Sequence, residues 1–223
     1  MEINRKISED LHTMEILTAI KPFVVEVFGT PNSGKSTAIR ELEKTLKDKK
    51  IKYKIIYEVA SQCGIKNKLS LEFNLWTLNE TLKQLIETVS GDYDIVICER
   101  GLIDTICWCE LYLQNNLMTS DEYRKIVDYI LLERFVGQIK CEFIFKCSDK
   151  TSLQREKNNG ANGIMGTIKN ENVLSKYNSC LDRIIEKYGD VFKSIVVIDT
   201  DNLSQKAINE IFISKIFECA NNI

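Results

Sequence analysis

Short apolar runs alternate with amphipathic stretches along most of the chain. Five of the apolar runs are expected to form β-strands, at 23–28, 53–58, 93–99, 141–147 and 194–199. Between the strands, apolar residues recur every three or four positions, which predicts helices over 35–49, 71–89, 102–115, 121–138, 171–189 and 202–220. Strands that alternate with helices predict an α/β fold, with a five-stranded parallel sheet covered by helices on both faces.

Two segments differ from this alternation. The apolar residues from Ile7 to Leu17 fall on one face of a short amphipathic helix. Residues 155–172 contain three glycines and five asparagines with little periodicity, which predicts a mobile loop. The sequence shows neither an internal repeat nor an interdomain linker, so we expect residues 1–223 to form a single domain.

Composition narrows the classes of partner. The 223 residues are 44% hydrophobic, which is enough for one large domain with a buried core. Thirty basic residues against 32 acidic ones give a net charge of −2, which argues against a nucleic-acid partner. No apolar run approaches the roughly 20 residues needed to cross a bilayer. The charged N-terminus lacks the apolar stretch of a secretion signal. We therefore expect a cytoplasmic protein.

The eight cysteines are accompanied by a single histidine, and several of them lie inside apolar runs. Free cysteine behaves in such runs as a small buried hydrophobe. The pattern is typical of a reduced intracellular protein with thiols in its core, and it argues against a metal–thiolate site.

The most specific motif directly follows the first predicted strand. Residues 29–36, GTPNSGKS, match the pattern G-x-x-x-x-G-K-[ST] between a strand and a helix. The glycines permit a tight turn whose backbone N–H groups converge on a triphosphate, and the helix adds its positive end. Lys35 would supply charge to the outer phosphates, and Ser36 would offer a hydroxyl to Mg²⁺. The predicted nucleotide-binding residues are Gly29, Thr30, Pro31, Asn32, Ser33, Gly34, Lys35, Ser36 and Thr37.

An acidic partner for the magnesium ion is expected at the end of a neighbouring buried strand. The run DIVICE ends in Glu99, in the position of a Walker B acid. Ligands of open α/β sheets bind at the carboxyl ends of the strands. The sequence thus predicts a three-layer P-loop NTPase fold that binds ATP and Mg²⁺, with Ser36 and Glu99 at the metal.

The segment CERG, residues 98–101, resembles the Glu/Asp-Arg motif of the P-loop nucleoside and nucleotide kinases, the deoxynucleoside kinase and thymidylate kinase group. The longer run ERGLIDTICW is also similar to a signature of small AAA-like ATPase and kinase domains related to ribosylnicotinamide kinase. The resemblance extends from Phe23 to about Asn202. It implies a small-molecule kinase with a lid at about 155–172. Dimers through surface helices are common in that family, although the sequence leaves the oligomeric state open.

The resemblance implies roles for three charged residues. Glu58, at the end of the second predicted strand, matches the carboxylate that takes the proton from the attacking hydroxyl. Arg100 would hold the acceptor oxygens or the transferring phosphoryl group. Asp104 fits two interpretations equally: a hydrogen bond to a sugar hydroxyl of the acceptor, or a first-turn acid that complements the helix dipole.

Further residues are implied at the base and at the lid. Phe73-Asn74 falls where the family often has Phe-Gln, whose amide contacts a nucleobase, and asparagine is shorter by one methylene. Phe73 or Trp76 would either stack on a ring or belong to the core. Arg155 matches the first lid arginine, and the lid would close to exclude water. Residues 198–202 follow the last strand, where adenine is commonly held.

The leading hypothesis is a kinase that transfers the γ-phosphate of ATP to a nucleoside or nucleotide, with Lys35, Glu58, Arg100 and Arg155 as the catalytic residues. Alternatives are a kinase for another acceptor, such as ribosylnicotinamide or an RNA end, and a regulatory NTPase without a small-molecule acceptor. The absence of a basic excess argues against an RNA end, and the absence of an N-K-x-D run argues against a GTPase switch.

Overall fold

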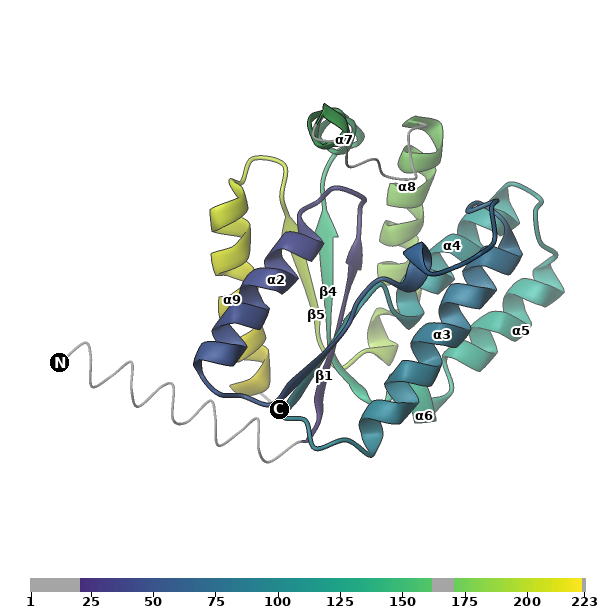
Figure 1. Ribbon diagram of the computed structural model, residues 1–223. Coiled ribbons are helices and arrows are strands. Elements are labelled where there is room, and N and C mark those ends of the chain that lie inside the picture. The colour runs from purple at the N-terminus through teal and green to yellow at the C-terminus, as the bar shows by residue number, and fades with distance from the viewer. Residues whose placement is uncertain (1–20, 162–170, 222–223) are drawn as a thin grey trace.

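A single β-sheet with helices on both faces forms the centre of the molecule (Figure 1). The computed structural model describes residues 21–161 and 171–221. The helix predicted from Ile7 to Leu17 lies outside the described residues, as does part of the predicted lid, residues 162–170. Within the described ranges, no helix is long and apolar enough to cross a membrane.

The sheet has five parallel strands in the order β2-β3-β1-β4-β5. The strands are β1 (Phe23–Gly29), β2 (Tyr53–Ile56), β3 (Ile95–Glu99), β4 (Ile139–Lys146) and β5 (Ile195–Asp199). All five carboxyl ends therefore lie at one edge of the sheet, the upper edge in Figure 1. The predicted α/β class and the five-stranded parallel sheet are confirmed. The second strand is shorter than the predicted 53–58, because its pairing with β3 ends at Ile56.

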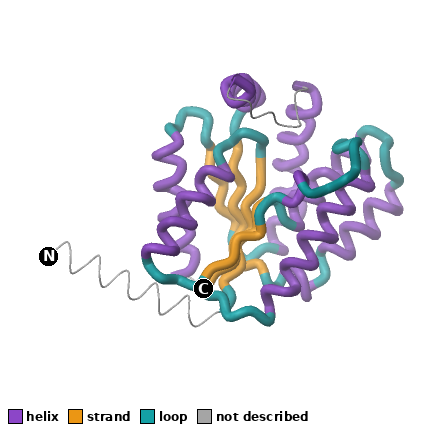
Figure 2. The backbone as a smooth tube through the Cα atoms, viewed as in Figure 1, coloured by secondary structure: helices purple, strands orange, loops and turns teal. Residues whose placement is uncertain are grey.

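Helices form the two outer layers (Figure 2). The α-helices of the described residues are α2 (Lys35–Asp48), α3 (Leu71–Val89), α4 (Leu102–Gln114), α5 (Ser120–Ile130), α6 (Glu133–Val136), α7 (Asp149–Ala161), α8 (Glu171–Tyr188) and α9 (Gln205–Asn221). One face of the sheet is covered by α2 and α9, and the other by α3, α4, α5 and α8. The result is the predicted three-layer arrangement.

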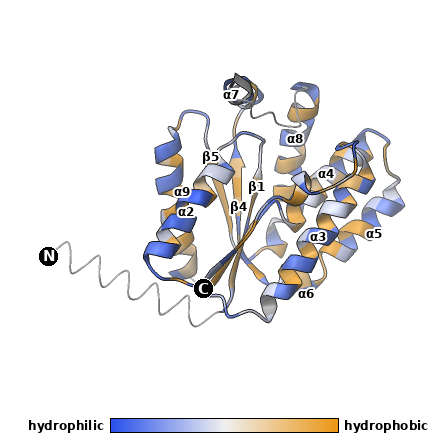
Figure 3. Ribbon diagram, viewed as in Figure 1, coloured by the Kyte–Doolittle hydropathy of each residue, from blue (hydrophilic) through white to orange (hydrophobic). Residues whose placement is uncertain are grey.

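The central strand β1 shows how the two cores are built. Val25 and Val27 pack with α2 and α9, whereas Val24 and Phe28 pack with helices of the opposite layer. Successive side chains of a strand point to opposite faces, so each face of β1 supplies one core. Figure 3 shows the same arrangement, with hydrophobic strands in the middle and hydrophilic surfaces on α2 and α9. Seven of the eight cysteines are buried, and all eight are free.

The helix predicted over 121–138 is wrong in its second half. Helix α5 begins with a capping box between Thr119 and Glu122, but it ends at Ile130. Leu132 adopts an extended conformation, with φ −55° and ψ 129°, before the single turn of α6. The chain changes direction there before β4 begins at Ile139. The apolar spacing along 121–138 gives no sign of this change of direction.

The mobile loop predicted over 155–172 is also wrong for its first part, because residues up to Ala161 belong to helix α7. Long-range contacts hold this helix. The hydroxyl of Ser152, which is 2% exposed, donates to the carbonyl oxygen of Pro31 at 2.8 Å, and Arg155 reaches the same loop. The asparagines and the glycine near its end are weak helix formers, and the tertiary contacts stabilise the helix.

Candidate active site

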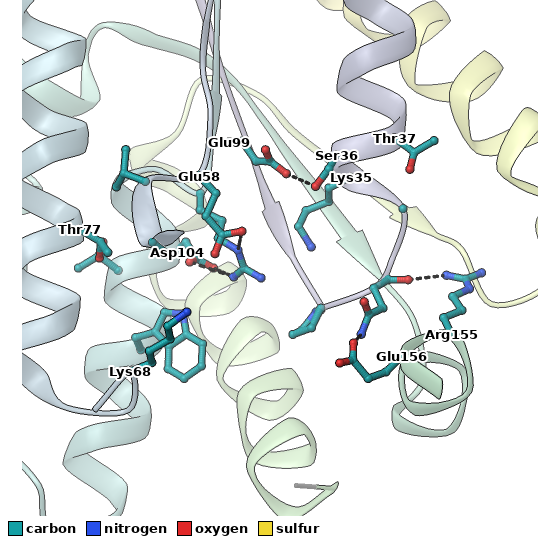
Figure 4. Close-up of a pocket in the computed structure, with 18 of the residues that line it drawn as sticks. Lys35, Ser36, Thr37, Glu58, Lys68, Thr77, Glu99, Asp104, Arg155 and Glu156 are labelled. Atoms are coloured by element: carbon teal, nitrogen blue, oxygen red, sulfur yellow. Dashed lines mark hydrogen bonds and ion pairs between the residues drawn. The ribbon is translucent and has the colours of Figure 1, made fainter. Parts of the chain in front are cut away.

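The carboxyl ends of the strands open into a cavity of about 620 Å³. Its lining comes from the phosphate loop, from the turns after β2 and β3, and from helices α3, α4, α7 and α9. Figure 4 shows Lys35 near its centre, with Glu58 and Asp104 on one side and Arg155 and Glu156 on the other. Segments that are far apart in the sequence therefore share one site.

The phosphate loop has the backbone that its glycines require. Gly29 has φ +125°, and a Cβ there would lie 2.1 Å from the carbonyl oxygen of Phe145. Gly34 has φ +96° at the N-cap of α2. Side chains are excluded at Gly29 because β4 runs directly beside it. The loop thus leads into the N-terminus of α2, whose first-turn N–H groups have no partner within the helix and can face an anion.

Lys35 is bound by the loop itself. Its ammonium donates to the carbonyl oxygens of Gly29 and Thr30, at 3.0 and 2.6 Å, and to the hydroxyl of Ser33 at 3.2 Å. Burial, together with the nearby positive charge of Arg100, lowers the pKa of Lys35 to about 8. Phosphate oxygens would supply the negative charge that this buried cation lacks.

The predicted magnesium pair is brought together. The hydroxyl of Ser36 at the start of α2 donates to the carboxylate of Glu99 at the end of β3 (Figure 4). Glu99 is 4% exposed. A hydroxyl and one carboxylate fit Mg²⁺, which binds few protein oxygens and takes its remaining ligands from phosphates and water. The described residues contain no group of three or more His, Cys, Asp or Glu suited to a metal.

Opposite the phosphate loop, two carboxylates share one guanidinium. The Nε atom of Arg100 lies 3.1 Å from Glu58, and its Nη1 atom lies 3.3 Å from Asp104. Arg100 has φ +57°, a conformation that costs energy in a residue with a side chain and that is concentrated at functional sites. Tyr177 of α8 donates its hydroxyl proton to Asp104.

Glu58 differs from the other two charged residues in its exposure. It lies two residues beyond β2 rather than at its end, as the N-cap of a short 3₁₀ helix, Val59–Ser61. Its side chain is 41% exposed, against 17% for Arg100 and 7% for Asp104. Glu58 therefore lies at the rim of the cavity, open to solvent.

Aromatic residues form the wall beyond Asp104. Phe73 and Asn74 line the cavity, and the side-chain amide of Asn74 donates to the carbonyl oxygen of Thr105 at 3.4 Å. Trp76 is not among the described residues that line the cavity, and the indole there is Trp108 of α4.

The Trp108 ring lies 5.1 Å from that of Tyr177, centroid to centroid. The sequence interpretation missed Trp108, Tyr112 and Tyr177. The spacing of Trp108 from Asp104, one helical turn, was the available signal for the first of these.

Arg155 faces the phosphate loop from α7. Its guanidinium donates to the carbonyl oxygen of Asn32 at 3.2 Å and to the hydroxyl and carbonyl oxygens of Thr200 at 3.0 and 2.6 Å. The neighbouring Glu156 accepts a hydrogen bond from the side-chain amide of Asn32 at 2.8 Å. Arg155 therefore connects the helical part of the predicted lid to the loop and to the segment after β5.

Further residues that line the cavity were not predicted from the sequence, and Gln205 of α9 is one of them. Its amide donates to the carbonyl oxygen of Gly34 at 3.3 Å. Arg40 and Lys68 also line the cavity and add two positive charges. No short motif marks these residues, because they come from segments without a recognisable pattern.

The strand order, the phosphate loop after β1 and the Glu-Arg pair after β3 define the class: the chain has the P-loop fold of the deoxynucleoside kinases. Three structures of deoxyadenosine kinase from M. mycoides are similar to it. The structure with the products dCMP and a flexible dCDP has a TM-score of 0.67 and 20% identity, and covers 88% of this chain and 100% of its own.

The M. mycoides structure with dCTP has a TM-score of 0.66 at 19% identity, and covers 88% of this chain and 100% of its own. The structure with dATP has the same TM-score and identity, over 87% of this chain and 99% of its own. No protein-family model matches the chain, and no curated protein does either.

Proposed function

We propose that the protein is an ATP- and Mg²⁺-dependent kinase that transfers the γ-phosphate to a hydroxyl group of a nucleoside or nucleotide. The observation that carries this proposal is the shared cavity. One cavity is lined by the phosphate loop and by the charged group of Glu58, Arg100 and Asp104. Direct transfer of a phosphoryl group requires that the donor subsite and the acceptor subsite lie in contact.

The proposed reaction assigns each charged residue one task. Glu58 accepts the proton of the acceptor hydroxyl while that oxygen bonds to the γ-phosphorus and the bond to the β-phosphate oxygen breaks, leaving ADP. Lys35 and Arg100 stabilise negative charge on the transferring group. Arg155 would turn from its carbonyl partners toward the phosphates. Bound Mg²⁺, with Ser36 and Glu99 among its ligands, would neutralise phosphate charge.

A deoxyribonucleoside is the acceptor that we propose to test first. The similar structures are deoxyadenosine kinases with deoxyribonucleotides bound. In this chain, Asp104 would accept a hydrogen bond from a sugar hydroxyl, and Phe73 and Trp108 would stack on the base. Asn74 would contact a base edge. Lys68 and Arg40 line the cavity, and their positive charges would suit a phosphate group. A nucleoside monophosphate is therefore the second acceptor to test.

The test is incubation with ATP-Mg²⁺ and a panel of acceptors, read out as phosphorylated product by chromatography and mass spectrometry. The panel contains deoxyribonucleosides, ribonucleosides, their monophosphates, ribosylnicotinamide and an RNA with a free 5′-hydroxyl. We expect product with at least one nucleoside or nucleotide. ATP turnover that is indifferent to every acceptor would reject the kinase proposal and favour a regulatory NTPase.

Lys35→Ala is the control for the donor half of the site. Removing the ammonium removes charge stabilisation of the outer phosphates, so transfer should fall by at least about a hundredfold. Near wild-type transfer by this variant would contradict the assignment of the phosphate loop.

A further inference from the structure

Two glutamates are buried inside the sheet and are not part of the charged group described above. Glu26 of β1 is 0% exposed and Glu142 of β4 is 1% exposed. The two residues are paired in register on neighbouring strands. Both point to the face that α4 covers, since Val24 and Ile144, two positions away from each, pack in that core. Buried carboxyl groups are costly, so each needs a physical explanation.

The burial of Glu26 is explained by its contacts with helix α4, because its carboxylate caps the N-terminus of that helix. Its Oε2 atom accepts a hydrogen bond from the N–H of Leu102 at 2.9 Å. Its Oε1 atom accepts from the N–H groups of Ile103 and Asp104 at 2.9 and 3.3 Å. These first-turn N–H groups have no partner within the helix, and the N-cap residue Gly101 has no side chain to offer. The cap therefore comes from a strand 76 residues earlier in the chain.

Gly101 fits this cap through its lack of a side chain. A Cβ at Gly101 would lie 2.5 Å from the carboxyl carbon of Glu26 and 2.6 Å from its Oε2 atom. There is therefore no room for a side chain at this position. The glycine of the CERG segment and the glutamate of β1 are thus complementary.

Val27, the next residue of β1, contacts the start of the turn between β3 and α4. The carbonyl oxygen of Val27 accepts the N–H of Arg100 at 2.9 Å. Two consecutive residues of β1 therefore fix the turn that carries Arg100 and the helical turn that carries Asp104. The same strand continues into Gly29 of the phosphate loop. β1 thus sets the distance between the phosphate loop and the Arg100–Asp104 pair.

We propose that Glu26 is a positioning residue for the phosphate acceptor: by capping α4 from β1, it fixes Asp104 and Arg100 relative to the phosphate loop. This inference rests on the proposed function, because contact of Arg100 and Asp104 with an acceptor is part of that proposal. Glu26 itself is buried beneath the turn, so it acts through these two residues.

The experiment compares Glu26→Gln with Glu142→Gln. Glutamine keeps the size of glutamate but replaces one acceptor oxygen with an NH₂ group that faces the N–H donors of α4. Glu142 is a matched control: it is equally buried and in register, and its carboxylate oxygens have no hydrogen-bond partner among the described residues. Three quantities are measured: the KM for the acceptor, the affinity for ATP-Mg²⁺, and amide hydrogen exchange over 101–106.

For Glu26→Gln we expect the acceptor KM to rise about tenfold to a hundredfold, with ATP affinity within about twofold of wild type. Exchange over 101–106 should become faster. Glu142→Gln should change none of the three. Gly101→Ala should reproduce the Glu26→Gln pattern, because it disturbs the same contact from the other side. A thermal melt identifies any variant that does not fold, and Glu26→Asp then replaces Glu26→Gln.

Equal effects of Glu26→Gln and Glu142→Gln on all three quantities would overturn the proposal, because both residues would then act only on overall stability. An unchanged acceptor KM in Glu26→Gln would overturn it as well. If the wild-type protein phosphorylates no acceptor, the proposed function falls and takes the acceptor role with it. Exchange over 101–106 still decides whether Glu26 fixes the start of α4.

Discussion

At the scale of single residues, Lys35 is a buried cation whose partners are neutral carbonyl and hydroxyl oxygens. Its pKa of about 8 lies below the ordinary 10.5, with burial as the largest cause. Bound phosphates would favour the charged form and raise the pKa again. Between pH 8 and 10.5, nucleotide binding should therefore take up a proton.

We predict that the affinity for ATP falls as the pH rises above about 8, by up to about tenfold per pH unit. Calorimetric titration at pH 8.5, in buffers with different heats of ionisation, measures the proton uptake directly. Lys35→Ala is the control, since it removes the titrating group. Equal heats in all buffers for the wild-type protein would contradict the prediction.

The second residue-scale prediction concerns Glu58. If Glu58 takes the proton of the acceptor hydroxyl, Glu58→Gln should lower kcat by about 10² to 10⁴ and leave ATP affinity nearly unchanged. Glu87→Gln is a suitable control, because Glu87 is exposed near the far end of α3. Steady-state kinetics with the best acceptor provide the measurement. A kcat equal to that of the control would make Glu58 a structural partner of Arg100.

At the scale of elements, five of the six predicted helices agree with the structure to within a few residues, and the exception is 121–138, where α5 ends at Ile130. Helix α3 is an example: it spans the predicted 71–89, and its Leu78, Leu82 and Leu85 are buried in the core. Helix α7 was not predicted, because its hydrogen bonds to the phosphate loop and to Thr200 involve segments about 45 to 120 residues away. Local composition carries no signal of such contacts.

The aromatic wall of the site shows the same limit. Trp76 and Trp108 are both on helices that border the cavity, and spacing alone does not say which indole points into it. The packing of α3 against α4 decides this, and it selects Trp108. The phosphate loop, in contrast, could be proposed from the sequence alone, because its motif consists of eight consecutive residues.

At the scale of the whole molecule, the buried glutamates make stability depend on pH. Burial is the largest cause that raises the pKa of Glu26, to about 8, and burial also raises the pKa of Glu142, where the charge of Glu26 adds to the effect. In the unfolded chain both groups titrate near 4.5. Above pH 4.5 the folded state therefore binds protons that the unfolded state has lost. This stabilisation is complete below pH 4.5 and is lost as the pH rises toward 8 and beyond.

We predict that the free energy of unfolding of Glu142→Gln declines less steeply with pH than that of the wild type. The difference should reach about 1.4 kcal/mol per pH unit for one proton. Urea unfolding at several values between pH 5 and 8 measures it. Glu87→Gln should leave the wild-type slope unchanged, and a Glu142→Gln slope equal to that of this control would show that Glu142 does not carry the proton.

The sequence by itself determined the alternation of strands and helices, the phosphate loop and the likeness of the CERG segment to kinases. Each of these depends on neighbours along the chain. Only the tertiary structure decided the strand order, the meeting of Glu58, Arg100 and Asp104, the helical form of α7 and the cap that Glu26 places on α4. These features depend on contacts between segments far apart in sequence, and such contacts leave no periodic pattern in either partner.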